Sequence, residues 1–497
     1  MVVLMLNKMV ISIVTLLSLL LSRDVAAQKN TPYYEQFLKS EKIYNTILNS
    51  WNNGAAFKNS DNLTGHIVWG ESYVMDSLLD MYLATTDKSY LLKFIEHADA
   101  VNNNRDDIAG NLDWQDQTDF GWLTDGHFTL GIPITISDTR GKPSIELQAI
   151  RYGNNNSTYF SVKHDRKRNS FSIKTWNDKI KKVQSFNNLT MDSVEIIVNK
   201  SISPSSLLKL RRMGNSRPKE IEEERFYTYR TRLISFHNPV ICSPFARFSY
   251  LVKELSLSQF DGKAKEYLGI AEECANSYSS LWVENDVSGY FLVKENDAFW
   301  MSGLPVPHNI LSASGILYLY LYLSTNKKEY QDKIIKISNT IKSGFLGTPT
   351  SGIEFHYAYG LLFNGWKDRN MFLYPNFQGS KHVEDNMHFS FTLRFIIESH
   401  QLLGLFDRAY INNLLHFFKM SYKNGNISYY TDGSGGTKYA NQSAGSYVLL
   451  SSFEQHIIDQ CSFIYQRDFK DLERGYVLSG WARITRMAIL LSNEGSE

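Results

Sequence analysis

The segment Met81-Tyr-Leu-Ala-Thr-Thr-Asp-Lys-Ser-Tyr90 returns almost position for position as Leu321-Tyr-Leu-Ser-Thr-Asn-Lys-Lys-Glu-Tyr330. Each copy separates two stretches in which apolar residues recur at helical spacing, so each marks the turn of a helical hairpin. The flanking stretches are 69–85, 90–101, 309–323 and 328–343, and a third hairpin with a different join is expected over 384–403 and 407–422. Recurrent hairpins predict a mainly α fold, a closed (α/α) toroid, because an open array would expose apolar inner faces at its ends.

One long segment, 128–236, interrupts this helical pattern. Short alternating or β-branched runs at 159–164, 170–176 and 194–198 predict strands, with Asn and Gly clustered between them. We therefore expect a β-rich insertion at 128–236, between a first part of the barrel at 28–127 and the remainder at 237–497. The basic run 163–182 inside it is either a solvated strand face or a surface that meets a polyanion.

The first 27 residues have the pattern of a signal peptide. Lys8 precedes an apolar stretch, 9–21, that is too short to span a bilayer, and Val25-Ala-Ala27 provides small residues for cleavage. We expect a secreted protein with no membrane segment after cleavage. Asn-X-Ser/Thr tripeptides make glycosylation of some positions an expectation, although several such tripeptides arise by chance in an Asn-rich chain. They begin at Asn62, Asn156, Asn188, Asn199, Asn426 and Asn441.

Bulk composition narrows the function classes. The chain has 497 residues, 43% of them hydrophobic, and a formal net charge of +1, so nothing in its overall charge predicts binding to nucleic acid. The three cysteines, Cys242, Cys274 and Cys461, have no metal-site spacing and allow at most one disulfide. No phosphate-binding loop, dinucleotide fingerprint, nucleophile elbow or zinc motif occurs, so we expect neither a cofactor nor a metal.

Polar residues stand at the starts of the helices expected to line the toroid. Glu71, Asn309, Glu384 and His388 each precede an apolar stripe on their own helix. If these helices point the same way, the four side chains converge on one mouth of the barrel. The alternative is that the acidic residues only cap helices, since a carboxylate in the first turn gains roughly 0.3–1 kcal/mol from the helix dipole.

A strand expected at 353–359 adds titratable groups. Alternation places His356 on one face and Tyr357 and Tyr359 on the other. His237 stands just before Asn-Pro at the start of another helix and is a further candidate. Trp69 and Trp122 lie near helix starts, where they could stack on sugar rings or simply roof the core.

Several motifs together resemble the (α/α)-barrel polysaccharide lyases that cut glucuronan or alginate. They are Trp69-Gly-Glu-Ser-Tyr73 with the first hairpin turn, Pro305-x-Pro-x-Asn309, His356-Tyr357, and Val383-Glu-Asp385 with His388. The resemblance covers roughly 34–125 and 237–491 and implies a secreted enzyme that cleaves an anionic, uronate-containing polysaccharide by β-elimination. The β-rich insertion and His356 depart from the family pattern.

The resemblance also implies roles for individual residues. Elimination needs a base for the proton beside the uronate carboxylate and an acid for the leaving oxygen. Tyr357 is the leading acid/base candidate, supported by Tyr359, with His356 or His237 as partner. Asn309, Glu384 or Arg369 would engage the substrate carboxylate.

Three other functions fit the same sequence. A glycoside hydrolase would use two carboxylates, with Glu71 and Glu384 as the obvious pair. A uronate epimerase would share the proton-abstraction machinery. A non-catalytic glycan-binding ectodomain would keep the aromatic residues and turn its tyrosines and histidines into the core.

Overall fold

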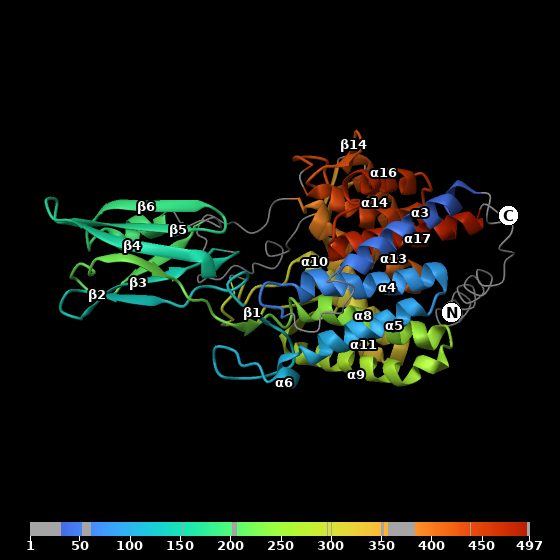
Figure 1. Cartoon of the computed structure of the whole chain (residues 1–497), viewed down its shortest axis with the longest axis horizontal. Coiled ribbons are helices and arrows are strands. Elements are labelled where there is room, and N and C mark those ends of the chain that lie inside the picture. The colour runs from blue at the N-terminus through green and yellow to red at the C-terminus, as the bar shows by residue number, and fades with distance from the viewer. Residues whose placement is uncertain are drawn as a thin grey trace.

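The computed structural model describes residues 31–51, 61–151, 153–200, 206–295, 297–299, 301–348, 352–355, 383–437 and 439–494. Figure 1 shows a ring of helices and, at its left, a sheet-rich part. The two parts are joined beside the short paired strands β1 (Leu123–Thr124) and β9 (Thr231–Arg232). The mainly helical toroid with some sheet that the sequence predicts is confirmed.

The described helices form an inner and an outer layer. Each inner helix packs against the next, and the last of them closes the ring against the first. The inner layer consists of α4 (Ser72–Thr85), α8 (Asn238–Glu254), α10 (His308–Thr325), α13 (Asn386–Leu403), the short α15 (Ala444–Tyr447) with the 3-10 turn η7 (Val448–Ser452), and α17 (Gly475–Glu494). The outer layer consists of α3 (Pro32–Ser50), α5 (Ser89–Asn103), α9 (Asp261–Ser277), α11 (Lys328–Ser343), α14 (Arg408–Ser421) and α16 (Ile457–Asp468).

The repeated sequence segment builds the same turn twice. Helices α4 and α10 are followed directly by their C-cap residues, Thr86 and Asn326. Both have a left-handed backbone conformation, with φ of 58° and 59°. Their amides donate to Tyr82 and Tyr322. A threonine hydroxyl one residue earlier bonds back into the helix in both copies. The third hairpin turns differently, at Gly404, as its different sequence predicts.

Burial separates the two layers. Nearly every residue of α10 up to Leu321 is buried, whereas α11 buries only one stripe, including Ile334, Ile337 and Ile341. A helix that is apolar all round must be enclosed, and one with a single apolar stripe covers it from outside. The hydrophobic core of the ring therefore lies between the layers.

The sheet-rich part contains two antiparallel sheets around a hydrophobic core of their own. One has the order β2 (Ile134–Ser137), β3 (Pro143–Ala149), β7 (Leu208–Arg212). The other has the order β6 (Lys182–Leu189), β5 (Ser170–Asn177), β4 (Thr158–Asp165), β8 (Ile221–Arg225). Leu147 and Phe160 are fully buried in the core that the two sheets share.

The strand expected at 194–198 is wrong. The structure has helix α7 (Val194–Lys200) there, because the amide of Val194 donates to Thr190 and starts the first turn. Its β-branched residues are not all buried, as those of a core strand would be, since Ile196 is 69% exposed. Periodicity alone does not separate such a short apolar run from a strand.

Short hairpins and turns complete the described chain. The hairpins are β10 (Trp282–Glu284) with β11 (Gly289–Phe291), β12 (Phe345–Thr348) with β13 (Gly352–Phe355), and β14 (Tyr422–Lys423) with β15 (Asn426–Ile427). The remaining turns are α6 (Asp106–Ala109), the π-turn η2 (Ile67–Glu71), and the 3-10 turns η3 (Asn155–Ser157), η4 (Ser258–Phe260), η5 (Ser279–Leu281) and η6 (Ala440–Ser443).

Charged side chains cross the axis of the ring. Asp76 of α4 accepts hydrogen bonds from Arg247 of α8 at 2.7 Å and from both terminal nitrogens of Arg394 of α13 at 2.6 and 2.9 Å. Asp80, one turn further along α4, accepts from Arg247 at 2.5 Å and from Arg486 of α17 at 3.0 Å. Burial alone would raise the pKa of Asp76, but the arginine charges lower it well below its usual range. The network therefore ties helices on different sides of the ring together.

The structure bears on one expected glycosylation acceptor and on the three cysteines. Asn62, an expected glycosylation acceptor, is 2% exposed and its side chain bonds the amide of Val68, so this position is inaccessible in the fold. Cys242, Cys274 and Cys461 are all free and buried. The expected signal peptide lies outside the described residues.

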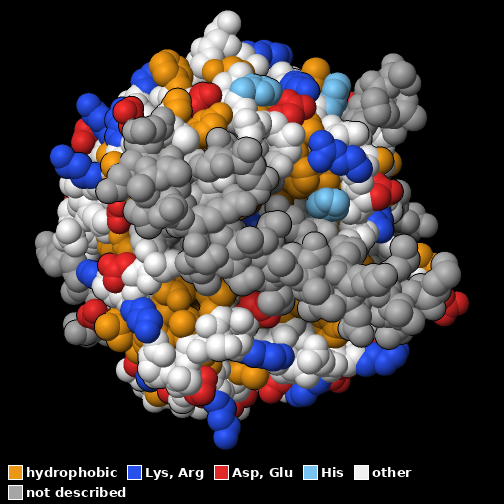
Figure 2. Space-filling model, turned by 90° about the vertical axis from the view of Figure 1, so that its right-hand side faces the viewer, with side chains coloured by type: hydrophobic (Ala, Val, Ile, Leu, Met, Phe, Trp, Pro, Cys, Tyr) orange, Lys and Arg blue, Asp and Glu red, His pale blue; other side chains and the backbone are white. Residues whose placement is uncertain are grey.

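Among the described helices, none combines the length and the apolarity that crossing a membrane requires. Figure 2 shows the end of the ring that faces away from the sheets, where basic and acidic side chains are interspersed over the described surface.

Candidate active site at the mouth of the helical ring

The inner helices α4, α8, α10 and α13 begin on the side of the ring that carries the sheets, beside β1 and β9 (Figure 1). The chain enters α4 through the π-turn η2, an irregularity that often accompanies functional sites. The first residues of these helices therefore lie on the same side of the ring. We call this end of the ring the mouth.

Aromatic rings meet at the mouth. The Trp69 ring lies 6.0 Å from His237 and 6.3 Å from Phe391 of α13, centroid to centroid. Phe391 in turn lies 5.9 Å from Tyr73 of α4. Since α4 and α13 are not neighbours in the ring, these rings bridge its axis and form a floor above the Asp76 network.

Glu384 lies directly before α13 and is fully buried. Its backbone is held on both sides, since its amide donates to Phe355 at 2.7 Å and its carbonyl accepts from Thr431 at 3.1 Å. Among the described residues, neither carboxyl oxygen has a hydrogen-bond partner. Burial, and then the negative charge of Asp385, raise the pKa of Glu384 well above its usual range. Its surroundings therefore favour the protonated carboxyl group, which is able to donate a proton.

The pKa of Asp385, the next residue, is shifted in the opposite direction to that of Glu384. Asp385 caps α13, with Oδ1 accepting from the amides of Met387 and His388 at 3.1 and 3.0 Å, while Oδ2 lies 2.5 Å from His388 Nδ1. Burial alone would raise the pKa of Asp385, but the His388 side chain and the two amides lower it overall. The His388 side chain is 46% exposed, so this hydrogen-bonded pair reaches the surface.

The pair Glu384 and Asp385 thus offers an acid and a carboxylate side by side. Environments that push the pKa values of two neighbouring groups apart are the usual way in which a site assigns acid and base roles at one pH. Glu384 could protonate a leaving oxygen. Asp385, with His388 behind it, could accept a proton or stabilise positive charge.

His237 is placed at the mouth but sealed within it. It is fully buried between Trp69 and Phe128, and its Nδ1 accepts from Asn62 Nδ2 at 3.3 Å. Burial, and to a smaller extent His127, lower its pKa to about 3, so the imidazole is neutral. Asn62 fixes the proton on Nε2, for which the described part of the chain provides no hydrogen-bond partner.

The other predicted mouth residues divide between site and core. Asn309, in the first turn of α10, is 2% exposed, and no described residue hydrogen-bonds to its Oδ1. Glu71 is fully buried and bonds the His97 ring and, at 3.4 Å, the Trp51 indole nitrogen. Trp122 is 1% exposed and donates to the carbonyl of Val101, so it belongs to the core. His356, Tyr357, Tyr359 and Arg369 lie outside the described residues.

Sequence reasoning placed Asp385 in the same turn as Glu384 but gave it no role of its own. Its signal is the spacing to His388, which puts a carboxylate and an imidazole three residues apart at a helix start. The axial network was missed entirely. Its signal is Asp76 and Asp80, one turn apart inside an otherwise apolar helix.

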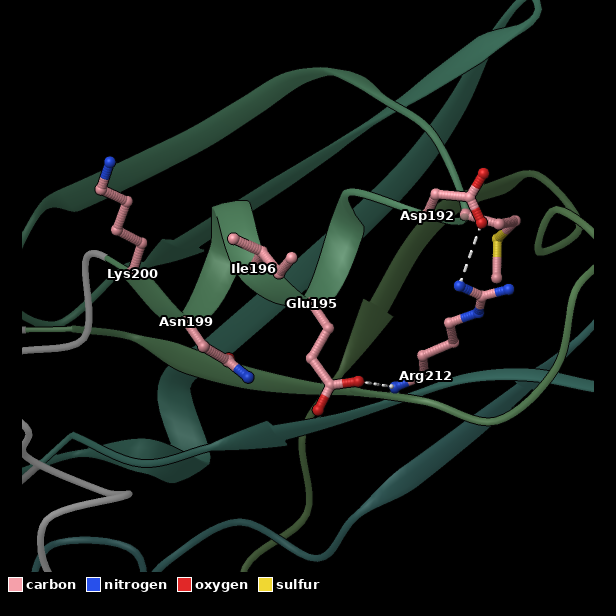
Figure 3. A pocket seen from close by; sticks show the side chains of 7 residues that line it. Asp192, Glu195, Ile196, Asn199, Lys200 and Arg212 are labelled. Atoms are coloured by element: carbon pink, nitrogen blue, oxygen red, sulfur yellow. Dashed lines mark hydrogen bonds and ion pairs between the residues drawn. The ribbon is translucent and has the colours of Figure 1, made fainter.

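A depression of about 520 Å³ lies on the sheet-rich part, beside α7 and β7 (Figure 3). Its charges are largely used within the protein: Arg212 pairs with Asp192 at 3.2 Å, and the Arg212 amide donates to Glu195 at 3.0 Å. The Asp192 side chain in it is 93% exposed. In the described part of the chain, no group of three or more His, Cys, Asp and Glu side chains is arranged to hold a metal.

Comparison with known proteins gives few matches. No family model matches the chain, and no curated protein sequence matches it. A solved structure of an inactive variant of an alpha-1,6-mannanase from Salegentibacter sp. HEL1_6, in complex with alpha-1,6-mannotriose, is similar over 92% of this chain and 99% of that one, with 10% identity and a TM-score of 0.43. A family 76 glycoside hydrolase from a bovine Bacteroides thetaiotaomicron strain is similar over 73% of this chain and 99% of that one, with 9% identity and a TM-score of 0.31.

These comparisons correct the predicted reaction. Both solved structures are of glycoside hydrolases, which contradicts the classification of this chain as a uronate lyase. The sequence motifs that suggested a lyase belong to the helical hairpins and their mouths, and one fold carries many reactions, so they indicate the architecture and not the chemistry.

Proposed function

We propose that this protein is a carbohydrate-active enzyme that hydrolyses a glycosidic bond of a polysaccharide at the mouth of the helical ring. The observation that carries the proposal is the pair of adjacent carboxyl groups at the start of α13, whose surroundings shift their pKa values in opposite directions. Glycosidases need such a pair, one acid for the leaving oxygen and one carboxylate for the water or the sugar carbon. The sequence suggested Glu71 and Glu384 as the two carboxyl groups. We assign Asp385 in place of Glu71, because the Glu71 carboxylate is hydrogen-bonded to His97.

In this mechanism Glu384 is the general acid and Asp385 the carboxylate that His388 holds in place. The floor of Trp69, Tyr73 and Phe391 supplies ring surface on which a sugar packs. The N-terminal end of α13 carries partial positive charge, which favours the ionised form of Asp385. We also propose that the first 27 residues direct secretion, which amino-terminal sequencing of the protein recovered from culture medium would test.

The test is incubation with a panel of neutral and acidic polysaccharides, with reducing ends measured against time. We expect reducing ends to appear with one polymer class without the ultraviolet absorbance of an unsaturated sugar. Glu384→Gln keeps the shape of the side chain but cannot donate the proton, and it should lower kcat by about 10²–10⁴-fold. Full activity of that variant would overturn the assignment.

One observation favours a second function, that of a non-catalytic glycan-binding ectodomain. His237 and Glu384 are both fully buried, as they would be in a cleft that has lost its chemistry. That function predicts binding of a polymer without any new reducing ends, and without a change in binding when Glu384 becomes Gln.

A further inference from the structure

The four-stranded sheet of the sheet-rich part has one face in the core and one face in solvent. Phe160 and Val162 of β4 and Phe171 and Ile173 of β5 are fully or almost fully buried and pack against the other sheet. The alternate residues of the same strands point away from that core. We call this second face the outer face.

A row of side chains crosses the outer face. Tyr159 of β4 stands opposite Trp176 of β5, and Trp176 stands opposite Val183 of β6. On the other side, Tyr159 stands opposite Arg225 of β8. The register therefore aligns Arg225, Tyr159, Trp176 and Val183 across all four strands. Their ring and aliphatic surface is accessible: Val183 is 56% exposed, and the two aromatic residues are partly exposed.

The two rings of this row are nearly parallel. Their planes differ by 13° and their centroids lie 5.8 Å apart, which is an offset arrangement across neighbouring strands. A cross-strand aromatic pair stabilises a sheet by about 0.2–1 kcal/mol whatever its function. A pair left partly exposed also offers ring surface to a flat, partly apolar ligand such as a sugar ring.

Cations surround the rings on the same face. Lys174 precedes Trp176 by two residues, is exposed, and holds its Nζ 5.6 Å from the indole centroid. Lys163 and Arg225 are also exposed. The acidic residue at the end of the same strand, Asp165, is already engaged by the amides of the turn that follows it. Exposed Glu222 and Glu223 lie further along β8, so the positive charge is concentrated around Lys163 and Lys174, where it is complementary to an anion.

We propose that the outer face binds an acidic polysaccharide, with sugar rings packed on Tyr159 and Trp176 and their carboxylate or sulfate groups paired with Lys174, Lys163 and Arg225. This site is separate from the mouth, so it holds the polymer without acting on it. It goes beyond the proposed function and does not depend on the reaction at Glu384.

The test uses the full chain carrying Glu384→Gln, so that no probe is consumed. Binding is measured by calorimetry with alginate, with dextran sulfate, and with uncharged dextran as the matched control. We expect binding of at least one acidic polymer, weakened by high salt because exposed charges are screened. Uncharged dextran should bind at least tenfold more weakly. Alginate and dextran sulfate separate carboxylate from sulfate recognition.

Two variants distinguish the site from a structural aromatic pair. Trp176→Ala should weaken binding about tenfold, which corresponds to about 1.4 kcal/mol, whereas Trp176→Phe should retain part of the affinity. Trp114→Ala removes an exposed tryptophan elsewhere, 44% exposed beside Tyr229, and should leave binding unchanged. Melting temperatures show that each variant is folded.

Three results would overturn the proposal: no binding of either acidic polymer by the parent chain, equal affinity for dextran and dextran sulfate, or unchanged affinity in a folded Trp176→Ala variant. If the outer face binds and the wild-type chain hydrolyses nothing, the proposed function fails while this inference stands. The reverse result, hydrolysis without binding at the sheet, leaves the mouth as the sole site of contact with the polymer.

Discussion

At the scale of single residues, Glu384 links the stability of the fold to pH. Its pKa is raised in the folded state because the carboxyl is buried and lies next to the negative charge of Asp385. Below the ordinary pKa of 4.5 both the folded and the unfolded state hold the proton. Above it the unfolded chain releases the proton first, so the free energy of unfolding falls as pH rises towards the folded pKa.

The corresponding prediction compares the wild type with Glu384→Gln across pH. The variant has no titrating group at this position, so its stability relative to the wild type should increase by up to about 1.4 kcal/mol for each pH unit above 4.5, until the folded pKa is reached. Urea unfolding at several pH values measures this difference. A constant difference across pH would show that Glu384 is not buried as a neutral acid.

Asp385 combines two roles that variants separate. Asp385→Asn retains an oxygen that can accept from the amides of Met387 and His388 but loses the charge, so stability should change little while hydrolysis is lost. Asp385→Ala loses both and should also cost about 1 kcal/mol of stability, the usual value of a helix cap. Denaturation and reducing-end measurements on both variants give the split. An active Asp385→Asn enzyme would contradict the proposed role.

At the scale of elements, the helical hairpins contain a small, removable strain. Thr86 adopts a left-handed backbone with φ of 58°, which a β-branched residue tolerates poorly, whereas Asn326 at the matching position has φ of 59° and suits that conformation better. Thr86→Gly should therefore raise the free energy of unfolding by up to about 1 kcal/mol, and Asn326→Gly should raise it by less. Equal effects on thermal unfolding would argue against backbone strain as the cause.

Elements also mark where sequence reasoning succeeded. The hairpins on either side of the repeated turn follow from local spacing and turn residues, and both turns have the predicted position. The strands at 159–164 and 170–176 are found within β4 and β5 for the same reason. The segment 194–198 is a helix because its first turn is fixed by Thr190, a contact that apolar patterning does not encode.

At the scale of the whole molecule, the axial ion network holds helices far apart in sequence. Arg394 of α13 bonds Asp76 of α4, 318 residues away, with both groups buried. Arg394→Met leaves a buried carboxylate with fewer partners and should cost about 3 kcal/mol, since breaking a buried pair from one side is strongly destabilising. The double variant with Asp76→Asn should recover part of this loss. Arg483 of α17 also lies near Asp76, with its Nη2 3.6 Å from Oδ2. A loss below about 1 kcal/mol would show that Arg247 and Arg483 suffice to hold the Asp76 carboxylate.

The reaction also depends on the structure of the whole molecule. The motifs around 69–73, 305–309 and 383–388 predicted a polar mouth on a helical toroid, and the structure gathers those residues there. They did not predict the reaction, and the lyase classification was wrong, because the same ring of helix starts accommodates different chemistry. What distinguishes acid from base in this mouth is the burial of Glu384 and the partners of Asp385.

The sequence by itself determined the helical hairpins, their turns and the polar residues at the starts of inner helices, because these depend on spacing within about ten residues. Only the tertiary structure decided which of those polar residues is available to a substrate. Glu71 hydrogen-bonds to His97 on α5, and His237 is buried between Phe128 and Trp69. Glu384 is fully buried, away from water. Burial and pairing are set by segments that meet only in the folded chain, and they fix the charge each group carries.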